Sequence, residues 1–376
     1  MRKLSNILFA TFISVLLSAN VFAQEDNQKY DFTDEVRLET TSVKDQGRSG
    51  TCWCFATVSF LETELIRMGK PEYNLSEMFL VHEAYKKKAR KYVRYHGNNN
   101  FGQGGQAHDA MYELEQHGIV PEEVYSGIIY GNDMHRHTEM ASVLSGFLDN
   151  LLDNRSNTLT PVWEDAYAGI LESYLGEIPE EFEYKGETYT PSSFANELDI
   201  DTDNYVELTS FTHQPYYQSF ALEVPDNWSH DPYYNLPLNE FVKVIDHSLE
   251  NGYSVVWDGD VSSKGYSHSN GIAVVPENME DNFKKHPVKE KEITAEYRQK
   301  QFNNFTMTDD HLMHLTGIGK DQEDTQYYLT KNSWDSDSND YGGFQYMSKP
   351  FIKLNTIAIM VHKDAIPGEI REKLEF

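Results

Sequence analysis

Two cysteines, Cys52 and Cys54, stand one residue apart and are the only thiols in the chain. A disulfide across a single residue would be strained, so we expect at least one thiol to stay free. A free thiol becomes a nucleophile when it is ionised, and the N-terminus of a helix favours the thiolate through its macrodipole. Such a helix is predicted from Cys52 onward, because apolar residues recur at spacings of three and four: Phe55, Val58, Leu61, Leu65 and Met68.

The period of this helix separates the two thiols. Cys54 lies two residues further in, and about 200° around the helix from Cys52. Both thiols therefore cannot face one cleft, and we expect Cys54 to be a small residue in the buried stripe. Gly69 followed by Pro71 predicts the end of the helix. A thiol redox protein that uses the Cys52-x-Cys54 pair is the alternative from another functional class.

The residues before Cys52 could hold a negatively charged oxygen. The pattern Gln46-Gly47-x-x-Gly50-x-Cys52-Trp53 predicts a tight turn that leads into the helix. The side-chain amide of Gln46 and the backbone N–H of Cys52 can then converge. Two such donors could bind the oxyanion of a tetrahedral intermediate.

A nucleophilic thiol also needs an imidazole base and a group that orients the imidazole. Residues 311–318 and 326–334 have the pattern of two strands, and 319–325 supplies the turn between them. The far ends of the two strands then meet, so His311 can lie near Asn332. His314 is the competing imidazole, and it lies three residues along the strand, hence on the opposite face.

These three segments resemble the nucleophile, histidine and asparagine segments of papain-like cysteine peptidases, in the same order. In that family the histidine stands six residues before a glycine, here Gly317, which selects His311 over His314. Further stretches are similar to the bleomycin hydrolase (aminopeptidase C) branch of the family. They are Gly104-Gly105-Gln106, 117–121, 175–194 and 365–370.

The resemblance implies an α+β, papain-like fold with two lobes. One lobe is helical and carries the nucleophile helix, the other is an antiparallel sheet or barrel, and a largely helical insertion is added. The nucleophile would be Cys52, with His311 as base and acid, Asn332 holding the ring tautomer and Gln46 binding the oxyanion. Gly104 and Gly105 would bind the substrate backbone, and Trp53 and Trp334 would support the site, with Trp334 shielding the histidine–asparagine hydrogen bond from water. No metal and no organic cofactor is implied.

The implied substrates are peptides, and the implied activity is that of an aminopeptidase. Members of this branch form hexamers, so a homo-oligomer is expected. A C-terminal arm restricts their cleft to free N-termini, and here the tail, 367–376, which begins within the last similar segment, is short. An endopeptidase of the same fold is therefore an alternative, and an inactive peptide-binding homologue is another. Asp335 stands where the family usually has a glycine after Asn-Ser-Trp.

The first 23 residues have the pattern of a signal peptide. Arg2 and Lys3 precede an apolar run at 7–17, and Val21-Phe22-Ala23 resembles a cleavage site. We therefore expect an exported protein, periplasmic or secreted. The formal net charge of −28 disfavours binding to nucleic acid or to anionic membranes.

The rest of the chain is expected to divide into four parts: residues 24–130 with the nucleophile helix, an insertion at 131–240 made of helices and long loops, a β-rich lobe at 241–366 and the tail 367–376. Further helices are predicted at 77–95, 107–117, 138–152, 163–174 and 238–250, and further strands at 253–257 and, more weakly, 271–275. The spacings His311-x-x-His314 and His135-x-His137 invite a metal site, but no cysteine or carboxylate cluster completes one on either segment.

Overall fold

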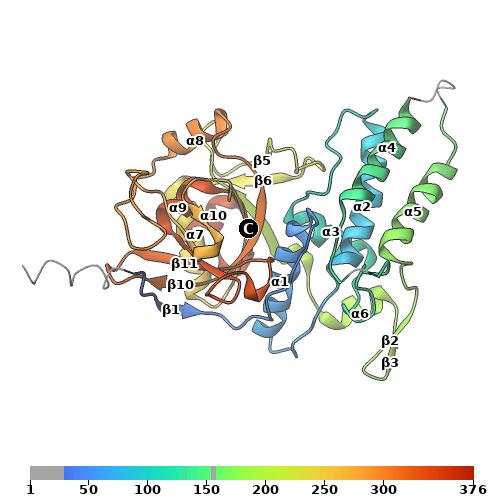
Figure 1. The fold of residues 1–376 in the computed structure, drawn as a ribbon, viewed down its shortest axis with the longest axis horizontal. Helices are drawn as coiled ribbons and strands as arrows, with labels where there is room; N and C mark the ends of the chain where they lie inside the picture. Colours follow the sequence, from blue (N-terminus) through green and yellow to red (C-terminus); the bar gives the residue numbers. More distant parts are fainter. Residues whose placement is uncertain (1–28, 132, 154–157) are drawn as a thin grey trace, which may run out of the picture.

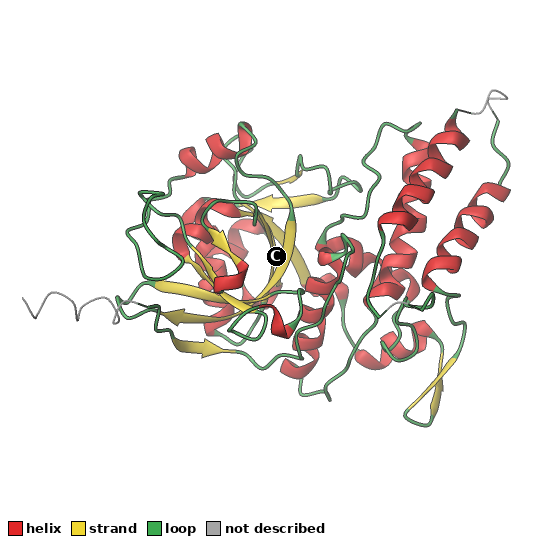
Figure 2. Cartoon of the chain, in the orientation of Figure 1, coloured by secondary structure: helices red, strands yellow, loops and turns green. Residues whose placement is uncertain are grey.

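The computed structural model describes residues 29–131, 133–153 and 158–376. The predicted signal peptide, 1–23, lies outside the described residues. The chain forms a helical half and a β-rich half that lie side by side (Figures 1 and 2). This mixed architecture confirms the predicted α+β class. In the described part of the chain, no helix is long and apolar enough to cross a membrane.

The helical half is built around α1, which begins at Cys52. Its elements are α1 (Cys52–Arg67), α2 (Glu77–Arg94), α3 (Ala107–His117), α4 (Thr138–Leu152), α5 (Val162–Leu175), α6 (Pro191–Leu198) and the hairpin β2–β3 (Phe182–Tyr184 and Glu187–Tyr189). Most of these helices were predicted to within two residues at each end, because the apolar spacing of each is clear. The exception is α6, which begins with Thr190 as a capping residue and Pro191 at its first position.

The β-rich half contains a sheet of eleven strands, in the order β5-β6-β4-β13-β7-β10-β11-β12-β9-β8, with β1 paired to β10. The strands are β1 (Thr33–Arg37), β4 (Tyr205–Thr209), β5 (Ser219–Ala221), β6 (Pro232–Asn235), β7 (Val255–Gly259), β8 (Tyr266–Ser267), β9 (Ile272–Ala273), β10 (His311–Lys320), β11 (Gln326–Lys331), β12 (Phe344–Ser348) and β13 (Thr356–His362). The helices of this half are α7 (Leu238–Glu250), α8 (Ala295–Asn303), α9 (Lys349–Asn355) and α10 (Gly368–Leu374).

The segment 131–240 differs from the expected helices and loops. Its first part packs as α4, α5 and α6 in the helical half, but β4, β5 and β6 join the main sheet. These strands are three to five residues long and β5 carries exposed positions. Short strands of this kind leave no clear alternation in the sequence, and β13, the strand that pairs with β4, is more than 100 residues away in the chain.

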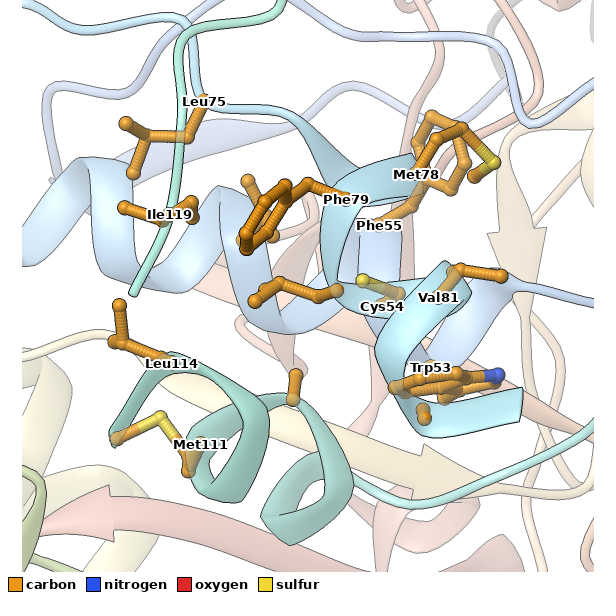
Figure 3. Packing of buried hydrophobic residues seen from close by; sticks show 14 of the residues in the cluster. Trp53, Cys54, Phe55, Leu75, Met78, Phe79, Val81, Met111, Leu114 and Ile119 are labelled. Atoms are coloured by element: carbon orange, nitrogen blue, oxygen red, sulfur yellow. The ribbon is translucent and has the colours of Figure 1, made fainter. Parts of the chain in front are cut away.

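Helix α1 is buried on all sides rather than along one stripe. Trp53, Cys54 and Phe55 pack with α2 and α3 in the first hydrophobic core (Figure 3). The polar positions Glu62 and Ser59 are also buried, at 0% and 9% exposure. The reason is that the opposite face of α1 packs against β7 and β10 of the sheet. The helix is therefore the element that joins the two halves.

A buried ionic network ties the segment before Gln46 to this helix. The ammonium of Lys44 contacts Glu62 of α1 at 2.9 Å and Glu77 of α2 at 2.7 Å. Burial lowers the pKa of Lys44, but the two carboxylates outweigh burial and raise it above its usual value. A charged lysine thus anchors residues 41–46 beside the start of α1.

Two buried histidines, His135 and His137, predict a loss of stability in acid. Burial lowers the pKa of His135 to about 4 and that of His137 to about 3. The unfolded chain binds a proton at each ring near pH 6.5, whereas the folded chain does not. This contribution to stability is therefore complete above about pH 6.5 and is lost as the pH falls toward 4. We expect the free energy of unfolding to drop by about 2 kcal/mol per histidine between pH 7 and pH 5.

Guanidinium unfolding of the wild type and of His137→Leu at the two pH values measures this effect. The variant should show the smaller drop. His96→Asn is the control, because His96 is exposed. Equal pH dependence in the wild type and His137→Leu would contradict the prediction.

Candidate active site

Cys52 is the first residue of α1 and is half-buried. As the first helical residue, it has a backbone N–H without an acceptor inside the helix. Its sulfur accepts a hydrogen bond from the backbone N–H of Leu312, the residue after His311. The nucleophile candidate and the start of β10 are therefore in contact.

Burial raises the pKa of the Cys52 thiol to about 12, and nearby carboxylates, Asp309, Asp226 and Asp258, add to the rise. The N-terminus of α1, on which the sequence-based expectation of a thiolate rested, acts in the opposite direction and lowers the thiol pKa. Removal of water from the thiol outweighs it, because the thiolate loses its hydration. An ionised Cys52 therefore requires a positive partner beside it.

His311 can be that partner. Its Nε2–H donates to Oδ1 of Asn332 at 2.8 Å, which leaves Nδ1 as the other ring nitrogen for the thiol. Burial lowers the pKa of His311 to about 4, with Asn332 acting against that change. Burial thus disfavours either ion alone, whereas a proton passed from Cys52 to His311 would create both charges together, and their attraction would offset the desolvation.

Several side chains hold Asn332 in place. Its Oδ1 also accepts from the backbone N–H of Ser333 at 2.7 Å, and its Nδ2 lies 3.3 Å from Tyr266 Oη and 3.3 Å from His268 Nδ1. The Trp334 ring packs against His311, tilted by 32°, with centroids 4.6 Å apart. The imidazole is therefore held at its edge by Asn332 and on its face by Trp334.

Gln46 lies next to the same segment and is 6% exposed. Its Oε1 accepts from Ser333 Oγ at 2.7 Å, and its Nε2 donates to the carbonyl of Ser49 at 2.7 Å. One of the two amide hydrogens is thereby used, and the second stays available for a ligand. The turn that brings this amide toward Cys52 needs Gly47, which has φ +61° and whose Cβ would lie 2.8 Å from the carbonyl oxygen of His135.

Gly104 and Gly105 lie beside the same helix. A Cβ on Gly105 would come within 3.1 Å of the Trp53 ring, whose Nε1 donates to the carbonyl of Gln103. A Cβ on Gly104 would lie 1.9 Å from Oδ2 of Asp226. The carbonyl of Gly104 accepts from the ammonium of Lys88, which is 1% exposed. Residue 104 thus has no room for a side chain.

The two residues that competed in the sequence for the roles of nucleophile and base, Cys54 and His314, lie away from this site. Cys54 is fully buried, lies among the side chains of α1 and α2 (Figure 3), and its thiol donates to the carbonyl of Glu77 at 3.2 Å. Both cysteines are free. His314 pairs with Ser59 Oγ at 3.0 Å, two turns along α1 from Cys52. The described residues contain no group of three His, Cys, Asp or Glu side chains arranged to hold a metal ion.

Sequence reasoning missed four residues around the site. Tyr266 and His268 contact Asn332, while Asp226 and Asp309 lie near Cys52. The first two come from a short strand and a 3-10 turn, and Asp226 comes from a loop. Only Asp309 had a signal in the sequence, because it stands two residues before His311.

Models of two peptidase families match the chain. The Peptidase C1-like family matches residues 171–376, which is more than half of the chain, and the papain family of cysteine proteases matches residues 27–147. The chain belongs to the Peptidase C1-like family. It is thus a papain-like cysteine peptidase of the aminopeptidase C family, as the sequence motifs predicted.

Relatives and a solved structure agree with this assignment. Aminopeptidase G of Lactobacillus delbrueckii subsp. lactis is 23% identical over 90% of this chain and 84% of its own length. Aminopeptidase C of Streptococcus thermophilus is 22% identical over 94% of this chain and 87% of its own. The crystal structure of PepW from Lactobacillus rhamnosis HN001 superimposes with a TM-score of 0.71 at 18% identity, covering 91% of this chain and 84% of that one. That likeness shows the same fold.

Asp335, next to this peptidase site, predicts a stabilising substitution. It has φ 70° and ψ 148°, a backbone conformation that is essentially restricted to glycine. Asp335→Gly should therefore raise the free energy of unfolding by about 1 kcal/mol, after the entropy cost of the glycine. Chemical denaturation measures this change. Asp335→Ala is the control, since it removes the carboxylate that accepts from the Asp337 backbone N–H without relieving the backbone strain. Equal stability of Asp335→Gly and Asp335→Ala would contradict the prediction.

Proposed function

We propose that this protein hydrolyses peptides by a thiolate–imidazolium mechanism and acts as an aminopeptidase. The observation that carries the proposal is the 2.8 Å bond between His311 Nε2 and Asn332 Oδ1, at the strand end whose next residue binds the Cys52 sulfur. That bond leaves Nδ1 as the ring nitrogen that would take the proton of the thiol. Relatives named aminopeptidase G and aminopeptidase C support the choice of free N-termini as substrates.

The proposed reaction has two halves. Cys52 transfers its proton to His311 and its sulfur attacks the peptide carbonyl carbon, forming a C–S bond and an oxyanion. The second amide hydrogen of Gln46 and the Cys52 backbone N–H bind that oxyanion. His311 then protonates the leaving amine as the C–N bond breaks, and a water molecule, deprotonated by His311, releases the acyl group and restores the thiol.

In this proposal the substrate backbone lies along Gly104 and Gly105. A Cβ at Gly104 would meet Asp226 and a Cβ at Gly105 would meet the Trp53 ring, so only glycines fit in this segment of the main chain. Trp53 supports this edge through its bond to Gln103, and Trp334 covers the His311–Asn332 bond. Shielding from water strengthens that bond, because the local dielectric constant is lower.

Export and assembly are further parts of the proposal. Residues 1–23 support export to the periplasm or the medium by their charge and hydropathy pattern. The resemblance to the bleomycin hydrolase branch supports a homo-oligomer, with a hexamer as the expected form. Light scattering of the purified protein and N-terminal sequencing of the exported form test these two parts.

Cys52→Ala should abolish peptide cleavage and labelling by an epoxide thiol reagent, because it removes the attacking sulfur. Cys54→Ala is the matched control, since Cys54 lies in the core and donates to Glu77. We expect it to retain cleavage. Mass spectrometry of peptide products and of the labelled protein measures both. Retained cleavage in Cys52→Ala, with loss in Cys54→Ala, would reverse the assignment.

Gln46→Ala should lower kcat by about 10²–10³-fold, because it removes one donor to the oxyanion. Steady-state kinetics on one peptide measures this loss. Gln322→Ala is the control, since it removes the same amide at the exposed turn between β10 and β11. A turnover of Gln46→Ala equal to that of the control would exclude the oxyanion role.

A further inference from the structure

The loop between β5 and β6, residues 222–231, connects the two halves of the molecule. We call it the strap. Strands β5 and β6 belong to the sheet, and their hairpin extends toward the helices (Figure 1). At the far end of the strap, Trp228 is 2% exposed, and its Nε1 donates to Asp109 of α3 at 2.9 Å. The strap therefore starts on the sheet and is anchored in the helical half.

Additional contacts fix the strap at both of its sides. The ammonium groups of Lys87, Lys88 and Lys91 of α2 lie 5.6–5.9 Å from the Trp228 ring. Asn99 donates to the carbonyl of Trp228 at 3.0 Å. Within the strap, the buried Asn227 donates to the carbonyls of Leu222 and Asp231, each at 3.0 Å. Its buried anchor and internal bonds indicate a preformed loop rather than a mobile one.

Asp226 of the strap lies against Gly104. Its Oδ1 accepts from Asn100 Nδ2 at 2.8 Å, which orients the carboxylate. Its Oδ2 lies 1.9 Å from the place where a Cβ of residue 104 would be, so the carboxylate covers that glycine. A peptide that continued past this point along the glycines would meet the carboxylate. Along the substrate path proposed above, the strap therefore stands in the way at Gly104.

The surroundings of Asp226 are acidic on the side of the thiol. Asp309, held by Gln106 Nε2 at 2.8 Å, and Asp258 both interact with Asp226 and with Cys52. Asp258 is 3% exposed, and burial together with the neighbouring Asp309 raises its pKa well above its usual value, so these two carboxyl groups hold a proton between them. Lys88 is a nearby cation, and its ammonium is engaged with the carbonyl of Gly104. A cation close to Cys52 would therefore be attracted.

We propose that the strap closes the cleft beyond one substrate residue and that the Asp226 carboxylate binds the α-ammonium group of that residue. This inference rests on the proposed peptidase function and identifies the residue that selects free N-termini. The cation bound by Asp226 could also be a lysine or arginine side chain of a substrate residue further toward the N-terminus. That ligand is the weaker candidate, because the backbone of such a residue would have to pass Asp226. The substrate class is peptides with an unblocked N-terminus.

Two substitutions separate the charge of Asp226 from its bulk. Asp226→Asn keeps the obstruction and removes the charge, so kcat/KM for a free-amine peptide should fall about 10- to 100-fold, mainly through KM. Cleavage of the N-acetylated peptide should stay low. Asp226→Ala removes both charge and bulk, and should gain cleavage of the acetylated peptide. Glu223→Gln, an exposed carboxylate of the same strap that pairs with His213, is the matched control and should behave as the wild type.

Kinetics on the free and acetylated forms of one peptide, analysed by mass, test the inference. Equal rates of the wild type on both forms, or an unchanged KM in Asp226→Asn, would overturn it. Calorimetry measures the binding of the two peptides to Cys52→Ala and to the double variant Cys52→Ala/Asp226→Asn. Because neither protein has the attacking sulfur, this measurement reports recognition of the N-terminus separately from peptide cleavage. Absence of cleavage by the wild type would refute the proposed function, while tighter binding of the free amine that depends on Asp226 would still support the strap's role.

Discussion

The burial of α1 on all sides, from Trp53 to Leu65, is the constraint on which the rest of the structure depends. The helix is covered by α2 and α3 on one side and by β7 and β10 on the other, so each polar group along it needs a partner inside the protein. Glu62 finds Lys44, Thr41 Oγ1 at 2.6 Å and the backbone N–H of Leu75 at 2.9 Å. Because Thr41 and Lys44 lie just before the turn at Gln46, and Leu75 lies on the approach to α2, satisfying one buried carboxylate also places the segment that leads to Cys52.

The electrostatics of the site follow from the same burial. A thiol and an imidazole that are both removed from water resist ionisation separately, so in the proposed mechanism the proton moves between them rather than to solvent. The carboxylates of Asp226, Asp258 and Asp309 make a thiolate more costly still. Such a cleft would gain from a cationic substrate, because an ammonium group beside the carboxylates offsets the field that opposes the thiolate. Substrate selection and activation of the nucleophile are then linked through one group of charges.

The scaffold is shared with relatives, whereas the side chains around the site are this chain's own. The family match and the 0.71 TM-score describe a shared scaffold, and identity of 18–23% leaves most side chains free to differ. The bonds from Tyr266 and His268 to Asn332, and the strap with Trp228 and Asp226, are formed by this chain's own side chains. Function in such a family depends on the site built on the fold, so we expect these side chains to determine the substrate specificity.

The sequence by itself determined the class of fold, the family and the positions of most helices. Those features depend on local spacing: an apolar period of three to four residues, a turn between two strands, and a cysteine six residues after a glutamine. Only the tertiary structure decided that α1 is buried on every side, that β4, β5 and β6 join the main sheet, and that Asp226 covers Gly104. Each of these features arises from contacts between segments far apart in the chain, such as the 122 residues between Gly104 and Asp226. Local periodicity carries no information about such contacts, because burial and field at a residue are set by whichever distant segment packs against it.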